Sequence, residues 1–243
     1  MACGEIGFLG NQLRLLQPTK GYRPGMDALL LSAFAPILPE ERLLDAGTGT
    51  GTLLLCLNKR MPQGLRFGVG VDIQTDMVAL ARQNFILNNA PHLSSLVAKM
   101  PMLPFKGPCF DHIVTNPPYS DLQTQQGSPV QQKSLSHQGT GVSLVAWFIA
   151  LAKILSAKGK LSCIIPAAKL PAVFQGLSMM NGFKILPVMT KPDQPINRFL
   201  VTCQKGVKAA PIFYHPLILE NRLGQPTLQI QQLSRGEQIL SFI

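Results

Sequence analysis

A glycine-rich turn after a short apolar stretch is the first part of the sequence that could do chemistry. Its residues read Asp45-Ala-Gly-Thr-Gly-Thr-Gly51. In a doubly wound sheet this is the turn where a ligand meets the strand ends. Glycines such as Gly47, Gly49 and Gly51 let the backbone approach that ligand closely. Asp72 follows about 20 residues later, which is the spacing of an acid that accepts hydrogen bonds from ribose hydroxyls.

The spacing of these glycines and the acid before them favour one nucleoside cofactor over another. The pattern GxGxG differs from the GxGxxG fingerprint of nicotinamide dinucleotides, and the Asp45 carboxylate would repel a pyrophosphate. The same carboxylate suits a ligand that carries an ammonium beside a sulfonium, which is S-adenosylmethionine. We expect the turn and Asp72 to bind this cofactor, with Ile73 beside its adenine. The alternative is a glycine-rich connection that binds nothing.

A second motif, Asn116-Pro117-Pro118-Tyr119, directly follows another predicted strand. A planar amino group is a poor nucleophile, because its lone pair is delocalised. The Asn116 amide oxygen and the Pro117 carbonyl can each accept one N–H and direct that lone pair toward a methyl group. Pro118 restricts the backbone, and Tyr119 offers a face on which an extruded base or amide can stack. We expect these four residues to be catalytic, the alternative being an ordinary proline turn.

Together these motifs resemble those of class I SAM-dependent N-methyltransferases of the NPPY type. Three further stretches are similar to the bacterial valine-tRNA adenine-N6 methyltransferase family, which methylates the adenine 3′ of the anticodon; they are residues 21–31, 146–166 and 198–206. The resemblance implies that Asp45, Gly47, Asp72 and the NPPY tetrapeptide have the same roles here. It also implies that Arg23 and Asp27 lie near the cofactor.

Two residues depart from the pattern of that family. Met26 stands where the family usually has a small hydroxyl residue, and residues 97–101 lack the acid that usually follows the third strand. The cofactor adenine would therefore be held there by backbone groups. These departures keep open the alternative of a catalytically silent protein that only binds RNA.

The charge distribution favours a polyanionic partner. Residues 1–150 hold 11 basic and 9 acidic side chains, whereas residues 151–243 hold 11 basic and 3 acidic ones. Such an asymmetry favours nucleic acid first, although a solvated basic surface is the alternative. We expect Lys191, Lys205 and Lys208 to form part of an RNA-facing surface beside the active site.

Other classes of site and location are not expected. The five cysteines and four histidines are dispersed, which argues against disulfides and against a metal site. The longest apolar stretch, residues 142–155, is too short to span a membrane, and no secretory signal is visible. We therefore expect a cytoplasmic protein without a metal and without a membrane partner.

Apolar periodicity predicts strands that alternate with helices, after an initial hairpin over residues 8–16 and a helix over 27–38. The expected strands are 42–46, 66–72, 93–98, 111–115, 160–165, 183–189 and 198–204. The expected helices are 52–60, 75–88, 142–156 and 169–180. Residues 120–141 are expected to form a long loop, and the tail an extended run over 212–219 and a helix over 228–240.

This alternation predicts an α/β fold with a Rossmann-like, seven-stranded, mostly parallel sheet, helices on both faces and a short N-terminal hairpin. We expect a single domain over residues 1–243, in which residues 1–40 form an extension and residues 41–243 the SAM-binding catalytic core. The expected function is methylation of an adenine N6 amino group in structured RNA, most simply tRNA. The alternative with the same tetrapeptide is methylation of a protein glutamine.

Overall fold

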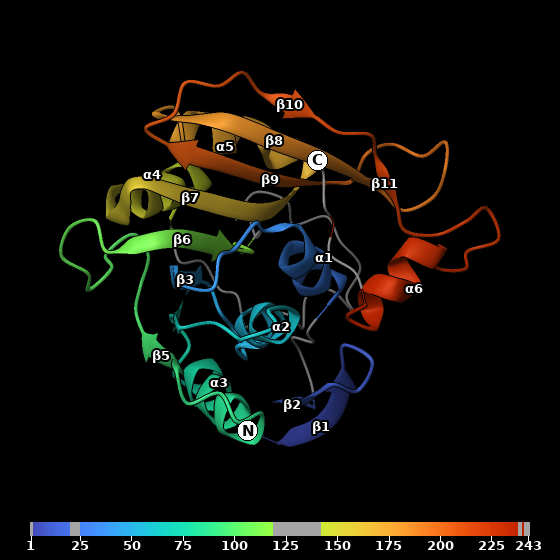
Figure 1. The fold of residues 1–243 in the computed structure, drawn as a ribbon, viewed down its shortest axis with the longest axis horizontal. Coiled ribbons are helices and arrows are strands. Elements are labelled where there is room, and N and C mark those ends of the chain that lie inside the picture. The colour runs from blue at the N-terminus through green and yellow to red at the C-terminus, as the bar shows by residue number, and fades with distance from the viewer. Residues whose placement is uncertain (1, 20–24, 119–141, 238–239, 241–243) are drawn as a thin grey trace.

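A mixed β-sheet forms the centre of the protein in a computed structural model that describes residues 2–19, 25–118, 142–237 and 240 (Figure 1). The sheet has nine strands. Along its main path the order is β10 (Ile212–Phe213), β8 (Met180–Met189), β9 (Arg198–Lys205), β7 (Leu155–Pro166), β6 (Phe110–Thr115), β3 (Arg42–Ala46), β4 (Phe67–Asp72) and β5 (Leu93–Val97). The short strand β11 (Leu217–Ile218) also pairs with β8.

The fold class expected from the sequence is confirmed. Strands β5, β4, β3, β6 and β7 pair in parallel, and β9 pairs antiparallel with both β7 and β8. The two strands beyond the expected seven are β10 and β11. Both are two-residue segments at the β8 edge, which is why alternation along the sequence indicates only one extended run there.

Helices cover both faces of the sheet, and each face has its own hydrophobic core. One core packs α1 (Met26–Phe34), α2 (Thr52–Arg60), α3 (Thr75–Leu87) and α6 (Leu228–Ser234) against the sheet. The other contains α4 (Leu144–Ile154) and α5 (Leu170–Gly176). Because both faces are buried, the central strands are almost continuously apolar. Among the described residues, no helix is long and apolar enough to cross a membrane.

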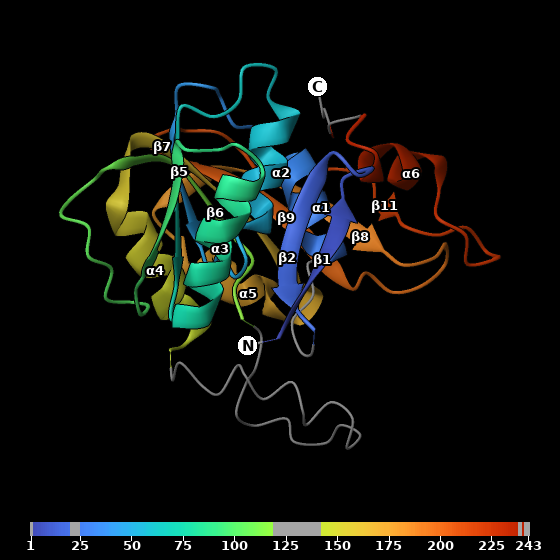
Figure 2. The ribbon, with the colours of Figure 1, turned by 90° about the horizontal axis from the view of Figure 1, so that it is seen from below.

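The N-terminal hairpin, β1 (Cys3–Phe8) and β2 (Leu13–Pro18), lies outside the main sheet and packs beside α3 (Figure 2). Two amides one helical turn apart hold it there. Asn84 accepts a hydrogen bond from the Leu16 N–H at 2.7 Å and donates to the Leu16 carbonyl at 3.0 Å. Asn88 pairs in the same way with the backbone of Arg14. Asn84 also donates to the Thr50 carbonyl at 2.9 Å, so the hairpin is tied to the glycine turn.

Several helices end earlier than the periodicity predicts. Helix α1 ends at Phe34 because Pro36 disfavours helical backbone at Ala35, which is extended. Helix α5 ends at Gly176, since strand β8 already begins at Met180. Helix α6 ends before Gly236, whose φ is positive. The long loop expected over residues 120–141 lies outside the described residues.

A buried histidine joins the sheet to the start of β3. His112 on β6 is fully buried, with Nδ1 3.2 Å from Glu41 Oε2 and Nε2 2.9 Å from the Ser162 hydroxyl. The Nδ1–H of a neutral imidazole can donate to Glu41, while the Ser162 hydroxyl beside Nε2 itself donates to the Thr202 hydroxyl at 2.9 Å. Burial lowers the pKa of His112, and the Glu41 carboxylate opposes this shift only in part. The folded protein therefore resists protonation of His112.

This burial predicts that stability falls as the pH drops through the ordinary pKa of histidine. Below about 6.5 the unfolded chain takes up a proton that folded His112 does not, so unfolding is favoured by up to about 1.4 kcal/mol per pH unit. The melting temperature should fall by up to about 4 °C between pH 7.5 and 5.5 through this group. The variant His112→Gln should show a much weaker dependence of the melting temperature on pH. An equal slope in both proteins would contradict the assignment.

Candidate active site

The sequence motifs meet at one edge of the sheet, where the parallel strands end. The glycine turn follows β3, Asp72 ends β4, and Asn116 follows β6. Because β3 pairs with both β4 and β6, the three segments are neighbours. The order of the strands thus joins motifs that are up to about 70 residues apart in the chain, at the edge where α/β sheets bind ligands.

The glycine turn has a backbone conformation that side chains resist. Gly47, Gly49 and Gly51 have φ values of 82°, 53° and 77°. The N–H groups of Gly47 and Thr48 both donate to the Val71 carbonyl at 2.9 Å, which holds the turn against β4. At Gly51 a Cβ atom would lie only 2.6 Å from the Phe85 ring, so this glycine is also required by packing against α3.

Asp72 faces this turn and already accepts two backbone hydrogen bonds. Its Oδ2 accepts from Gly49 N and its Oδ1 from Gln74 N, both at 2.9 Å. Each carboxylate oxygen has a further lone pair, which can accept from a hydroxyl of a ligand. Ile73, which is 41% exposed, follows directly and offers an apolar surface. These residues fit the ribose and adenine of a nucleoside cofactor.

Asp45 lies beneath the turn rather than at its open mouth. Asp45 is 1% exposed, and its Oδ2 accepts a hydrogen bond from the Thr48 hydroxyl at 2.8 Å. Burial raises the pKa of Asp45 to about 7; the Thr48 hydrogen bond opposes this shift and the nearby Asp72 carboxylate adds to it. A cationic ligand above the turn would keep Asp45 ionised. The negative charge of Asp45 beneath the turn complements the ammonium and sulfonium groups of S-adenosylmethionine.

The NPPY segment begins beside the glycine turn. Pro117 is buried, and Asn116 and Pro118 are partly exposed. A methyl group built on Gly47 would lie 3.7 Å from the Asn116 carbonyl oxygen, so the two motifs border the same space. Tyr119 and Arg23, which the sequence also predicts to be site residues, lie outside the described residues.

Asp27, predicted to lie near the cofactor, forms an ion pair with a residue that is distant in the sequence. Arg198 Nε, at the start of β9, lies 2.9 Å from Asp27 Oδ1 in the first turn of α1. Burial raises the pKa of Asp27, and the Arg198 guanidinium counteracts this shift. Because β9 runs antiparallel to β7, this ion pair lies at the same edge as the two motifs.

The structure separates the three lysines expected beside the active site. Lys191 follows β8, which runs in the same direction as the parallel strands. It therefore lies at the carboxyl ends of these strands, where the two motifs are, which we call the motif edge. Lys205 ends the antiparallel strand β9 at the opposite edge, where its Nζ donates to the Ala152 and Leu155 carbonyls at the end of α4. Lys208 follows it. The prediction is therefore wrong for Lys205 and Lys208, because strand direction cannot be read from charge.

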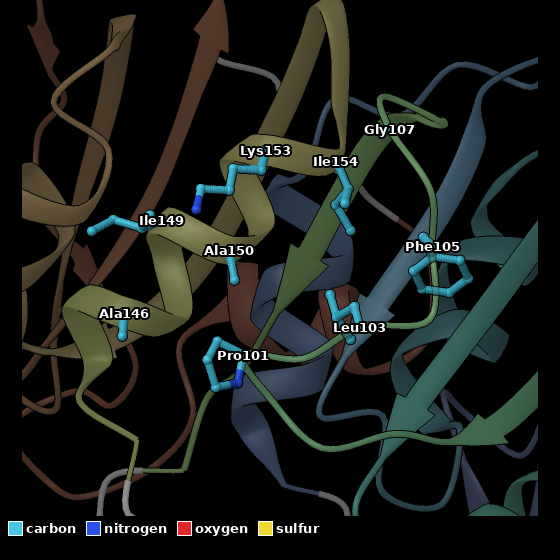
Figure 3. Close-up of a pocket in the computed structure, with 9 residues that line it drawn as sticks. All are labelled: Pro101, Leu103, Phe105, Gly107, Ala146, Ile149, Ala150, Lys153 and Ile154. Atoms are coloured by element: carbon cyan, nitrogen blue, oxygen red, sulfur yellow. The ribbon is translucent and has the colours of Figure 1, made fainter.

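An apolar groove of about 470 Å³ lies next to residues 97–101, the segment that lacks the acid expected after the third strand (Figure 3). It runs between α4 and the residues that follow β5. Pro101 and Ala146 lie at one end and Phe105 and Ile154 at the other, with Lys153 as its charged lining residue. None of the predicted cofactor residues lines it. Nearby, the Ala98 N–H donates to the Asp72 carbonyl at 2.9 Å, which holds this segment against β4.

Comparisons with known proteins agree with this site. Residues 43–129 match the model of a methyltransferase domain, and residues 98–181 that of the Eco57I restriction-modification methylase family. A tRNA1(Val) (adenine(37)-N6)-methyltransferase of Tolumonas auensis is 29% identical over 67% of this chain and 67% of its own length. That of Proteus mirabilis is 26% identical over 93% and 90%. The chain belongs to the class I SAM-dependent methyltransferases.

The fold of this methyltransferase is also found among solved structures. A predicted O-methyltransferase from Agrobacterium tumefaciens superposes with a TM-score of 0.72 over 89% of this chain and 99% of its own, at 21% sequence identity. At that identity the likeness concerns the fold. Enzymes of this class use S-adenosylmethionine as methyl donor, in agreement with the negative charge of Asp45 beneath the glycine turn. Among the described residues, no three His, Cys, Asp or Glu side chains gather as metal ligands.

Proposed function

We propose that this methyltransferase transfers a methyl group from S-adenosylmethionine to the N6 amino group of an adenine in structured RNA, most simply in a tRNA beside the anticodon. The observation that carries the proposal is the placement of Asn116, the first residue of the NPPY segment, next to Gly47 at the carboxyl ends of the parallel strands. The relatives named above, which are adenine-N6 methyltransferases of tRNA, support the substrate.

In this proposal each site residue has one task. Asp72 accepts the ribose hydroxyls, Asp45 and the glycine turn hold the amino-acid end of the cofactor, and Ile73 lies beside the adenine. The bound cofactor would supply an electrophilic methyl group; as the N–C bond forms, the S–C bond would break, leaving S-adenosylhomocysteine, and one amino proton would pass to solvent. The Asn116 amide oxygen and the Pro117 carbonyl accept the two N–H bonds of the adenine amino group, which aims its lone pair at that methyl group. Tyr119 stacks on the extruded base, and Arg23 and Asp27 lie near the cofactor. The whole chain acts as a single domain.

The proposal is tested by methyl transfer to several acceptors. Tritiated S-adenosylmethionine is incubated with the protein and, separately, with total tRNA, rRNA, DNA and a release-factor protein. We expect label in tRNA and N6-methyladenosine in its digested nucleosides. Label in the protein acceptor alone would establish glutamine methylation instead. A lack of label in every acceptor, with intact RNA binding, would establish the catalytically silent alternative.

The two edges of the sheet give a matched test of the RNA-facing surface. Lys191 and Arg222 lie at the motif edge, where Arg222 pairs with Asp193 at 2.9 Å, and Lys158 and Lys208 are exposed at the opposite edge. Reversing two charges in each pair changes the net charge equally. We expect Lys191→Glu with Arg222→Glu to weaken tRNA binding roughly 10-fold. The slope of the logarithm of the binding constant against the logarithm of the salt concentration should become shallower by about 1 for each lost phosphate contact.

The variant Lys158→Glu with Lys208→Glu is the control for net charge alone. It should leave tRNA affinity within about threefold of the wild type, because its charges lie about 25 Å of strand away from the motif edge. Titrations at several salt concentrations read out both variants. Equal losses in the two variants would mean that only net charge matters and would count against an RNA-facing motif edge.

A further inference from the structure

The indole ring of Trp147 lies where the two sequence motifs meet. Trp147 is in the first turn of α4 and is 5% exposed. A methyl group built on Gly47 would lie 3.6 Å from its Cζ2 atom and 3.7 Å from the Asn116 carbonyl oxygen. The ring therefore borders both the cofactor turn and the first residue of the NPPY segment. Its sequence position, in an apolar helix, indicates only a core residue.

A short chain of hydrogen bonds joins this ring to both strands of the site. Trp147 Nε1 donates to the Thr115 hydroxyl at 3.2 Å, and that hydroxyl donates to the Ala46 carbonyl at 2.7 Å. Thr115 is the last residue of β6, directly before Asn116, and Ala46 is the last residue of β3, directly before Gly47. Both polar groups are buried, so each needs its partner.

We propose that Trp147 is a positioning residue for methyl transfer, which sets the separation between Gly47 and Asn116 through ring contact and through the Thr115 hydroxyl. The inference rests on the proposed role of Asn116 in catalysis. An indole fills the space that a smaller ring would leave, and its N–H fixes the Thr115 hydroxyl toward β3. Loss of either contact lets the NPPY segment shift against the cofactor turn. A shift of about 1 Å can cost roughly 100-fold in rate.

The kinetic test uses four variants and whichever acceptor takes up tritium from labelled cofactor. Trp147→Phe removes the N–H and part of the ring, and Thr115→Val removes the hydroxyl at nearly constant shape. Each should lower kcat roughly 10-fold while affinity for S-adenosylhomocysteine stays within about threefold. The double variant should lose less than the product of the two single losses, because both single variants remove the Trp147–Thr115 hydrogen bond. Thr115→Ser should recover most of the turnover lost in Thr115→Val.

Phe148→Leu is the matched packing control. Phe148 is the next residue of α4, is fully buried and packs against Gly176 of α5. We expect this variant to lower the melting temperature as much as Trp147→Phe does, but to keep its kcat. If Phe148→Leu and Trp147→Phe lowered kcat equally at equal stability, the positioning role would be overturned.

A fluorescence arm does not depend on the acceptor, because Trp147 is the single tryptophan of the chain. Its emission should change saturably as S-adenosylhomocysteine is added, with the affinity that calorimetry gives. An unchanged emission at saturating ligand would overturn the contact between Trp147 and the cofactor turn. If tRNA accepts no label but protein does, the proposed function fails, while both arms still decide the role of Trp147.

Discussion

Replacement of Asn116 by alanine should reduce turnover roughly 100- to 1,000-fold, since it removes an acceptor that the reacting amino group uses most fully in the transition state. The backbone course of the segment should survive, because Pro117 and Pro118 restrict it and the Thr115 hydroxyl still holds the end of β6 against β3. Affinity for S-adenosylhomocysteine should therefore stay within about threefold. Mass spectrometry of nucleosides from treated tRNA measures the product, and calorimetry the cofactor analogue.

Asn197→Ala provides a matched loss of an amide at the same edge. The Asn197 side chain donates to the Thr190 hydroxyl within the β8–β9 connection and belongs to neither motif. We expect its turnover to stay within about threefold of the wild type. Retained N6-methyladenosine formation by Asn116→Ala would show that Asn116 is not the catalytic group.

Asp72→Ala should weaken binding of S-adenosylhomocysteine roughly 10- to 100-fold, which corresponds to about 1–3 kcal/mol for lost hydrogen bonds to a charged acceptor. Two effects contribute. The ribose hydroxyls lose their acceptor, and the N–H groups of Gly49 and Gln74 lose the carboxylate that holds them at 2.9 Å. The second effect loosens the glycine turn itself. Calorimetric titration measures the loss.

Asp76→Ala removes a second acid from the same connection and changes the net charge equally. Asp76 is exposed in the first turn of α3 and makes no contact with the glycine turn through any hydrogen bond found among the described residues. The affinity of the Asp76→Ala variant for S-adenosylhomocysteine should stay near that of the wild type. Unchanged affinity in Asp72→Ala would instead rule out Asp72 as the ribose acceptor.

The motifs at the ends of β3, β4 and β6 are legible in the sequence because each is local. A glycine turn, an acid at a strand end and an NPPY segment each need only the few residues around them. Parallel strands between helices then bring those ends to one edge whatever their order. This is why the fold class and the strand ends that carry Asp72 and Asn116 follow from the sequence alone, whereas the burial of Asp45 beneath the turn does not.

Boundaries and edge strands follow less well from the sequence, for a physical reason. Apolar periodicity continues past Phe34, but Pro36 ends the helix there. Strands β10 and β11 are two residues long and exist only because β8 offers them an edge. Pairing with a distant strand leaves no periodic signal in so short a segment.

The residue pattern alone predicts the class of cofactor, the chemistry that the motifs can support and the layered α/β architecture. It does not predict which distant residues meet, and these contacts are visible only in the folded protein. Arg198 pairs with Asp27, Lys205 holds the end of α4 at the far edge, and Trp147 borders Gly47. The first two depend on the order and direction of β7, β8 and β9, and the third on the pairing of β3 with β6 and on the placement of α4 beside them. Those are properties of the assembled sheet, because local preferences do not specify which strands become neighbours.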